Sequence, residues 1–293
     1  MHIRKIKAKF NSLSKIIKIV ESNKNITLIN ILKLSKQISF YFERANQTKT
    51  VIETIQKNYA VDSVFLQNNQ AGFFSSLKSK NTTPTIWVYV TEEEQYSTNS
   101  YFKHEQNILA ELKKNDKFIA IGERACNFVK NQNLTTIYSE NFNDVVKLSH
   151  NLPLVLQTEI LQKGFANIRF VINSSKIKSK YLDVLPLSAL NFNLNVKDYK
   201  LEEKIDVKKL KVYPDVQSFI ESEIASYLTY ISLTLLSESA LINQKYKLVA
   251  ENQKINDLEK KQKQLKLAMN RARREQEVEN MSLLSKKKDL LHE

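Results

Sequence analysis

Three adjacent carboxylates, Glu92, Glu93 and Glu94, are of a residue type that could act as general acid and base. They follow a predicted strand at 84–90, and open α/β sheets often bind ligands beyond the ends of their strands. No histidine, cysteine or glycine-rich phosphate loop accompanies them, so they do not form a recognisable catalytic set. A solvated loop is the favoured interpretation.

Cysteine and histidine, the other common catalytic and metal-binding types, are sparse. Cys126 is the single cysteine, which excludes an internal disulfide. The four histidines are too scattered to predict a metal site: His2, His104, His150 and His292. We therefore expect no catalytic residue, no metal site and no bound cofactor, and a reducing cytoplasm is the simplest setting.

Arginine is rare in this chain, and its distribution is uneven. Only seven of the 45 basic residues are arginine, and three of these are Arg271, Arg273 and Arg274. A guanidinium group holds a carboxylate through two hydrogen bonds, which lysine cannot do, so this group could bind acidic loops of a partner. The alternative is a solvated helix face, which the nearby Glu275 and Glu277 also favour.

The net charge of +14 invites a nucleic-acid function, but the excess of lysine, with abundant Asn and Ile, is typical of an AT-rich genome. We therefore expect no nucleic-acid partner. Residues 1–36 hold Arg4 and eight lysines against one acid, Glu21. Such a basic helix could bind a membrane surface, nucleic acid or acidic protein loops, or it could be a solvated face.

The elements that carry these residues are long helices at both ends. Neither proline nor glycine occurs in 1–71 or in 215–293, so both segments predict uninterrupted helix. A continuous helix over the last 79 residues would extend roughly 120 Å, which its own domain could not bury. It must lie along a second helix, and the N-terminal segment is the only other one of sufficient length.

Each terminal segment has apolar residues at steps of three and four, as a helix with one buried stripe requires. The N-terminal stripe comprises Ile16, Ile19, Val20, Ile26, Ile29, Leu32 and Ile38. The C-terminal stripe comprises Ile220, Ile224, Tyr227, Ile231, Leu235, Ile242, Tyr246 and Val249. We expect the two stripes to face each other in an antiparallel coiled coil.

The middle of the chain, 58–214, holds every proline and glycine. Short β-branched runs predict strands at 84–90, 117–122, 134–138 and 166–173, alternating with helices at 101–114, 124–130 and 143–163. This alternation predicts a small parallel, Rossmann-like sheet covered on both faces. The predicted fold is an α/β domain at 58–214, inserted between two coiled-coil helices at 1–57 and 215–293.

The sequence predicts neither a membrane span nor an export signal. The most apolar stretch, 225–237, is shorter than a span needs and carries several hydroxyl groups. At the N-terminus, Lys15 and Lys18 interrupt what would be the apolar core of a signal peptide.

Five short motifs occur in an order typical of one known family. Lys24-Asn-Ile-Thr27 and Lys33-Leu-Ser-Lys36 are similar to its K-I-T and S-K-L stretch, and Asn270-Arg-Ala-Arg-Arg274 is similar to its N-x-A-R-Q. Asp183-Val-Leu-Pro-Leu187 resembles its L-P-L, and Ser237-Glu-Ser-Ala240 loosely resembles its E-A-x-A-S-E. With the helix–domain–helix order, these motifs make the chain resemble the γ subunit, or central stalk, of F-type rotary ATPases over nearly its whole length.

Three departures distinguish the chain from that family. The glycine-bearing S-D-R-G-L-C-G-x-N turn is replaced by 91–99, which has no glycine, and the I-T-x-E stretch is replaced by Glu277-Val-Glu279. The closing G-A-x-A-L is replaced by Ser285-Lys-Lys-Lys-Asp-Leu-Leu291. In this respect the chain is more similar to divergent F-type-like ATPase paralogues of mycoplasmas, which hydrolyse ATP for another task such as gliding motility.

The resemblance implies a non-catalytic rotor subunit that couples ATP hydrolysis in a hexameric ring to rotation. The implied partners are the ring of α- and β-type subunits, which would bind ATP and magnesium, an ε-type stalk subunit, and a membrane sector whose presence stays open. The implied location is the cytoplasmic face of the cell membrane, reached through the complex. The candidate ring contacts are Lys24, Thr27, Asn270, Arg271, Arg273 and Arg274.

A second interpretation stays open. The chain could be a basic coiled-coil adaptor that binds a membrane surface or nucleic acid through residues 1–36. An adaptor predicts a discrete self-associating species, whereas a shaft predicts instability without its ring.

Overall fold

The computed structural model describes residues 3–59, 84–93, 100–163, 165, 167–174, 180–190 and 212–289. The chain divides into two compact units, each described here by itself. One unit combines 1–30 with 245–293, and the other is the continuous stretch 31–244.

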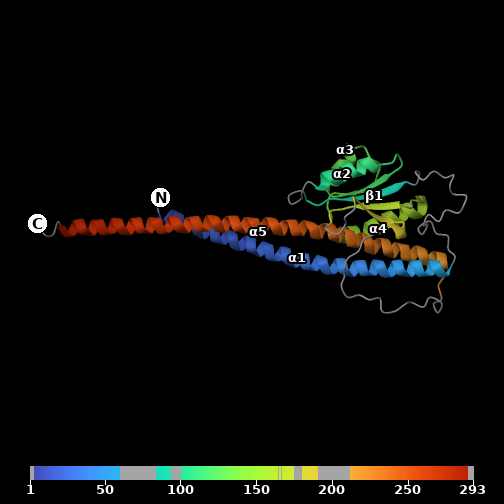
Figure 1. Ribbon diagram of the computed structural model, residues 1–293, viewed down its shortest axis with the longest axis horizontal. Helices are drawn as coiled ribbons and strands as arrows, with labels where there is room; N and C mark the ends of the chain where they lie inside the picture. The colour runs from blue at the N-terminus through green and yellow to red at the C-terminus, as the bar shows by residue number, and fades with distance from the viewer. Residues whose placement is uncertain are drawn as a thin grey trace. The chain divides into compact units, whose positions relative to one another are not determined.

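Two long helices supply the ends of the chain (Figure 1). Helix α1 is Ile3–Asn58 and helix α5 is Val216–Asp289, as the absence of proline and glycine predicted. The cap of α5 is built from local sequence: Asp215 follows Pro214 and accepts a hydrogen bond of 2.9 Å from the Ser218 backbone N–H.

The unit 31–244 contains a five-stranded sheet in the order β3-β2-β1-β4-β5. Its parallel strands are β1 Thr85–Val90, β2 Lys117–Ile121, β3 Thr136–Glu140 and β4 Asn167–Val171. The fifth strand, β5 Leu182–Leu185, runs antiparallel to β4. The predicted parallel sheet is thus confirmed for four strands, and the fifth makes it mixed, because the short β4–β5 connection leaves no room for a crossover helix.

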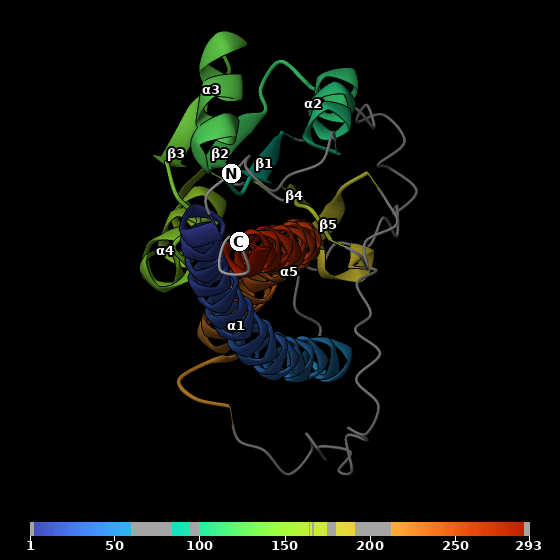
Figure 2. The same cartoon turned by 90° about the vertical axis from the view of Figure 1, so that its left-hand side faces the viewer.

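Helices cover both faces of this sheet (Figure 2). Helices α2 Ser100–Glu111 and α3 Glu123–Asn131 lie on one face, and α4 Val145–Lys163 lies on the other. Strand β1 is buried along its whole length, because Trp87 and Tyr89 enter the core under α2 and α3 while its alternate residues enter the larger core on the opposite side.

The larger core also contains buried residues of α1 between 38 and 55 and of α5 between 220 and 241. Phe42, Ala45 and Ile52 of α1 and Tyr227 and Leu228 of α5 are buried in this one cluster. The Tyr227 hydroxyl donates to the Val184 carbonyl over 3.2 Å, which ties α5 to β5. The predicted α/β insertion between two terminal helices that pack on each other is therefore confirmed.

The predicted apolar stripe of α1 is largely wrong. Val20 and Ile38 are buried, but the other five members are exposed by 43% or more: Ile16 43%, Ile19 61%, Ile26 54%, Ile29 63% and Leu32 64%. On α5 the prediction holds for Ile220 to Ile242, whereas Val249 is 55% exposed. Isoleucine is so frequent in α1 that more than one face is apolar, and the pairing with α5 selects which face is buried.

No helix among the described residues is long and apolar enough to cross a membrane.

Candidate functional site

The predicted contact residues all lie in the unit formed by 1–30 and 245–293, where α1 and α5 pair. From Ile255 to residue 284, the buried or half-buried positions of α5 follow alternating steps of three and four: Ile255, Leu258, Gln262, Leu265, Met269 and Ala272. The facing positions on α1 are Ile6, Phe10, Leu13, Ile17, Val20, Lys24 and Thr27. This is the repeat of a coiled-coil seam, and we call these residues the seam.

One polar contact fixes the register of the pair. Gln262 Nε2 of α5 donates to Ser14 Oγ of α1 over 2.7 Å, so these two positions lie side by side in the pair. Polar groups inside a coiled-coil interface specify register more than they add stability. The predicted antiparallel arrangement is present here.

The candidate contacts differ in accessibility. Thr27 is only 1% exposed and Lys24 is half-buried, because both are seam positions. Asn270, Arg271, Arg273 and Arg274 are exposed on either side of the seam residue Ala272. The Arg273 guanidinium donates to Glu277 Oε1 over 3.1 Å, but both side chains are more than half exposed, so this pair is weak.

The pairing does not bring the two candidate groups together. Because the two helices are antiparallel, the residues that follow Ser14 on α1 and the residues that follow Gln262 on α5 lie in opposite directions from the Ser14–Gln262 hydrogen bond. Lys24 lies ten residues beyond Ser14, and Asn270 lies eight residues beyond Gln262. At 1.5 Å per residue, the two groups are separated by roughly 27 Å along the pair. They therefore form two contact regions, not one.

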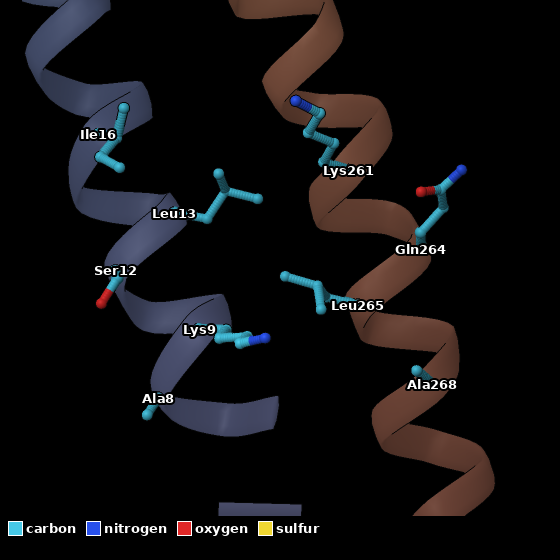
Figure 3. Close-up of a pocket in the computed structure, with 9 residues that line it drawn as sticks. All are labelled: Ala8, Lys9, Ser12, Leu13, Ile16, Lys261, Gln264, Leu265 and Ala268. Atoms are coloured by element: carbon cyan, nitrogen blue, oxygen red, sulfur yellow. The ribbon is translucent and has the colours of Figure 1, made fainter. Parts of the chain in front are cut away.

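A groove runs beside the seam, and the sequence did not reveal it (Figure 3). It measures about 670 Å³ and is lined by Ala8, Lys9, Ser12, Leu13, Ile16, Lys261, Gln264, Leu265 and Ala268. Leu13 and Leu265 point toward each other across it (Figure 3). The small residues Ala8, Ser12 and Ala268 leave the space, two lysines add positive charge, and no lining residue is acidic.

The interpretation of 92–94 as a solvated loop is wrong for Glu92 and holds for Glu93. Glu93 is exposed, but the Glu92 carboxylate accepts a hydrogen bond from Asn143 Nδ2, and its backbone N–H donates to the Tyr101 hydroxyl over 2.9 Å. Burial raises the pKa of Glu92, and the Asn143 amide works against that rise. Glu94 lies outside the described residues.

Other chemistry-bearing groups of the α/β domain are also packed. Cys126 is buried with its thiol within 3.5 Å of the Glu140 carbonyl oxygen, and burial raises its pKa. Arg124 forms two hydrogen bonds with the Glu105 carboxylate, at 2.6 and 3.0 Å. Within the described part of the chain, no three His, Cys, Asp or Glu side chains are grouped so that they could hold a metal ion.

Comparison with known proteins gives a relative that matches almost the whole chain. No model of a known protein family matches the chain. The protein UU050 of Ureaplasma parvum serovar 3, described as uncharacterized, is 31% identical over 288 residues, which cover 98% of this chain and 94% of that protein.

Three solved structures that are similar to this chain come from mitochondrial ATP synthases. A chain of the Euglena gracilis rotor in rotational state 1 is 14% identical, with a TM-score of 0.44, and the match covers 93% of this chain and 98% of that chain. A chain of the Euglena OSCP/F1/c-ring structure is 13% identical, with a TM-score of 0.46, and the match covers 99% of this chain and 94% of that chain. A chain of the Tetrahymena thermophila central stalk and c-ring is 18% identical, with a TM-score of 0.38, and the match covers 75% of this chain and 98% of that chain.

By its identity to UU050 over almost the whole of both sequences, the chain belongs to the same protein family as UU050 of Ureaplasma parvum.

Proposed function

We propose that this protein is a central-shaft, γ-type rotor subunit of an F-type or F-type-like rotary ATPase. The observation that carries the proposal is the antiparallel pairing of the two chain ends, which leaves an α/β domain inserted between them. The sequence motifs that resemble the γ subunit support it, because two of them, 24–27 and 270–274, lie in the paired unit.

The proposed mechanism needs a rod whose sides differ. The paired unit presents a groove with Lys9 and Lys261 on one side and exposed isoleucines on α1 elsewhere. Inside a ring of three equivalent catalytic sites, such a rod offers each site a different surface, so the open and closed states of each site are biased differently. Hydrolysis at successive sites would then step the rod.

In this proposal the chain itself performs no catalysis. ATP and magnesium are bound by the α- and β-type ring subunits, an ε-type subunit joins the stalk, and a membrane sector is a further candidate partner. The rotor then works at the cytoplasmic face of the membrane, and the departures from the γ pattern favour a task other than ATP synthesis, such as gliding motility in a mycoplasma.

The proposed ring contacts are the exposed Arg271, Arg273 and Arg274, together with Asn270 and Lys24. Thr27 would position its helix from inside the seam.

A second candidate function is favoured by one observation. Ile19, Ile26 and Ile29 of α1 are each more than half exposed, and the same helix carries Lys15 and Lys18. An apolar helix face bordered by lysines is typical of adaptors that bind anionic membranes. This candidate predicts a lone, self-associating protein whose binding to anionic vesicles falls steeply with salt.

Co-purification separates the two functions. The tagged protein is purified from its own cells under mild conditions, its companions are identified, and the eluate is assayed for ATPase activity. The shaft predicts two ring subunits, each in roughly threefold excess, together with ATP turnover. A lone dimer without turnover would contradict the shaft and favour the adaptor.

A further inference from the structure

The groove beside the seam is one end of a longer apolar strip on α1. Ala8, Ser12 and Ile16 line the groove, and Ile19 and Ile26 continue along the same helix. At about 100° per residue, these five positions lie within about 80° of one another around α1. All five are exposed, with Ile16 at 43%, Ile19 at 61% and Ile26 at 54%. We call these five residues the α1 strip, and it extends for roughly 27 Å beside the seam.

The groove itself is a channel between two helices. Its walls come from α1 between 8 and 16 and from α5 between 261 and 268, which is about two helical turns of each (Figure 3). At its centre the seam residues Leu13 and Leu265 point toward each other, so its floor is apolar (Figure 3). A helix that binds in such a groove inserts apolar side chains spaced three and four residues apart. The dimensions of the groove therefore suit one face of a third helix.

Positive charge surrounds the strip and the groove. The unit formed by 1–30 and 245–293 holds 20 basic residues against nine acidic residues, whereas 31–244 holds 25 against 22. Two of these lysines, Lys9 and Lys261, line the groove, and none of its nine lining residues is acidic. Charge complementarity selects partners of opposite sign, so an occupant of this surface should be acidic.

Other occupants fit these features less well than a helix does. A membrane-bound helix buries a convex apolar face in lipid, whereas here two helices form a groove with the polar Ser12 and Gln264 among its lining residues. Nucleic acid is bound chiefly through phosphate contacts, which exposed isoleucines cannot make. A second copy of this unit carries the same positive charge and would be repelled.

We propose that the α1 strip and its groove bind an acidic amphipathic helix of a partner protein, which makes the antiparallel pair part of a three-helix bundle. The partner helix would insert apolar side chains into the groove and along the isoleucines of the strip. Its glutamate or aspartate side chains would face Lys9 and Lys261. To match the length of the strip, it would need about 18 residues. This inference does not depend on the rotor assignment, because a shaft and an adaptor could each carry such a helix.

Site-specific photo-crosslinking tests the proposal in the native complex. The tagged full chain is produced in its own cells with benzoylphenylalanine in place of Ser12, Gln264 or Lys18, and the labelled peptides are sequenced after irradiation. Ser12 and Gln264 line the groove, whereas Lys18 is exposed about 120° away from Ser12 around α1. We expect positions 12 and 264 to label one segment of a partner, and position 18 not to label that segment.

The nature of the labelled molecule decides the outcome. A protein segment with net negative charge and apolar residues at steps of three and four would support the proposal. Labelled lipid or nucleic acid, or a segment without this pattern, would overturn it. Equal labelling from all three positions, as a ring that encloses the rod would give, would also overturn it while leaving the rotor assignment intact. The absence of any label from positions 12 and 264 would count equally against the third helix.

Charge reversal gives a second, quantitative measure with a matched control. K9E/K261E reverses both groove lysines, and K18E/K260E makes the same change in net charge at two exposed lysines that do not line the groove. We expect K9E/K261E to reduce the labelled segment recovered through position 12 by roughly tenfold, and K18E/K260E to reduce it by less than about twofold. All four side chains are exposed, so both variants should keep the helix content of wild type in circular dichroism. Equal losses in the two variants would mean that general surface charge holds the partner, and would refute the groove as its site.

Discussion

At the scale of single residues, Glu92 makes stability depend on pH. Burial raises its pKa above the ordinary value of 4.5, so the folded state disfavours its charged form. A group whose pKa is raised on folding contributes stability at low pH, and that contribution is lost as the pH rises through its folded pKa. Unfolding measured between pH 4 and 8 should therefore show a loss of stability in wild type that E92Q lacks.

The exposed neighbour gives the control for this prediction. E93Q removes the same charge from the adjacent residue, whose side chain is exposed. It should leave the pH dependence unchanged. Parallel pH profiles for wild type and E92Q would show that the Glu92 carboxylate ionises without cost.

Asp116 is the residue whose loss should be most damaging to the sheet. It is 5% exposed and accepts hydrogen bonds of 2.8 Å from the Thr85 N–H, 2.8 Å from Trp87 Nε1 and 3.1 Å from the Lys113 N–H. D116A leaves three donors unpaired, so we expect it to lower the free energy of unfolding by about 3 kcal/mol. Urea unfolding followed by Trp87 fluorescence measures this change.

An exposed aspartate serves for comparison. Asp144 caps α4 by accepting from the Val146 and Lys147 N–H groups, and D144A should cost only about 1 kcal/mol. Equal effects of D116A and D144A would mean that the Asp116 bonds are replaced by water.

At the scale of elements, the face of α1 that pairs with α5 can be tested with two residues of the same type. Ile17 is 7% exposed in the seam, whereas Ile19 is 61% exposed on another face. I17A should destabilise the paired unit by about 2 to 4 kcal/mol, and I19A by less than about 0.5 kcal/mol. Hydrogen exchange of the backbone amides in 1–30 reports the difference.

This pair of variants also separates folding from function on α1. In the adaptor interpretation, I19A should weaken vesicle binding although it leaves hydrogen exchange unchanged. If I19A accelerated exchange as much as I17A, the assignment of the buried face would be wrong.

At the scale of the whole molecule, the rotor proposal predicts an effect of surface charge on a distant active site. The double variant R273E/R274E should slow ATP turnover of the purified complex by roughly tenfold, because acidic partner loops would be repelled instead of bound. Its helix content by circular dichroism should match that of wild type, since both side chains are exposed.

The control for this variant is a charge reversal on the same helix. Lys260 is 77% exposed and makes only a 3.9 Å contact with Asp257, so K260E changes the net charge without touching the arginine group. It should leave turnover near the wild-type rate. Wild-type turnover by R273E/R274E would remove these residues from the mechanism.

The sequence alone determined the helices, most of the sheet and their order, because these depend on local properties. The absence of glycine and proline from both ends specified α1 and α5, and short β-branched runs specified β1, β2 and β4. The position of the exposed arginines on the last helix also followed from sequence. Each of these features is set by residues near one another in the chain.

Only the tertiary structure decided which apolar face of α1 is buried and what surrounds Glu92. Isoleucines occur on several faces of α1, so the choice of Ile17 over Ile19 depends on where α5 lies. The sequence predicted a solvated loop at Glu92 because its hydrogen-bond partners are distant in the chain. Asn143 lies 51 residues away, and Ser239 lies on helix α5. The groove likewise combines side chains from the two ends of the chain, and no local pattern in the sequence predicts that they meet.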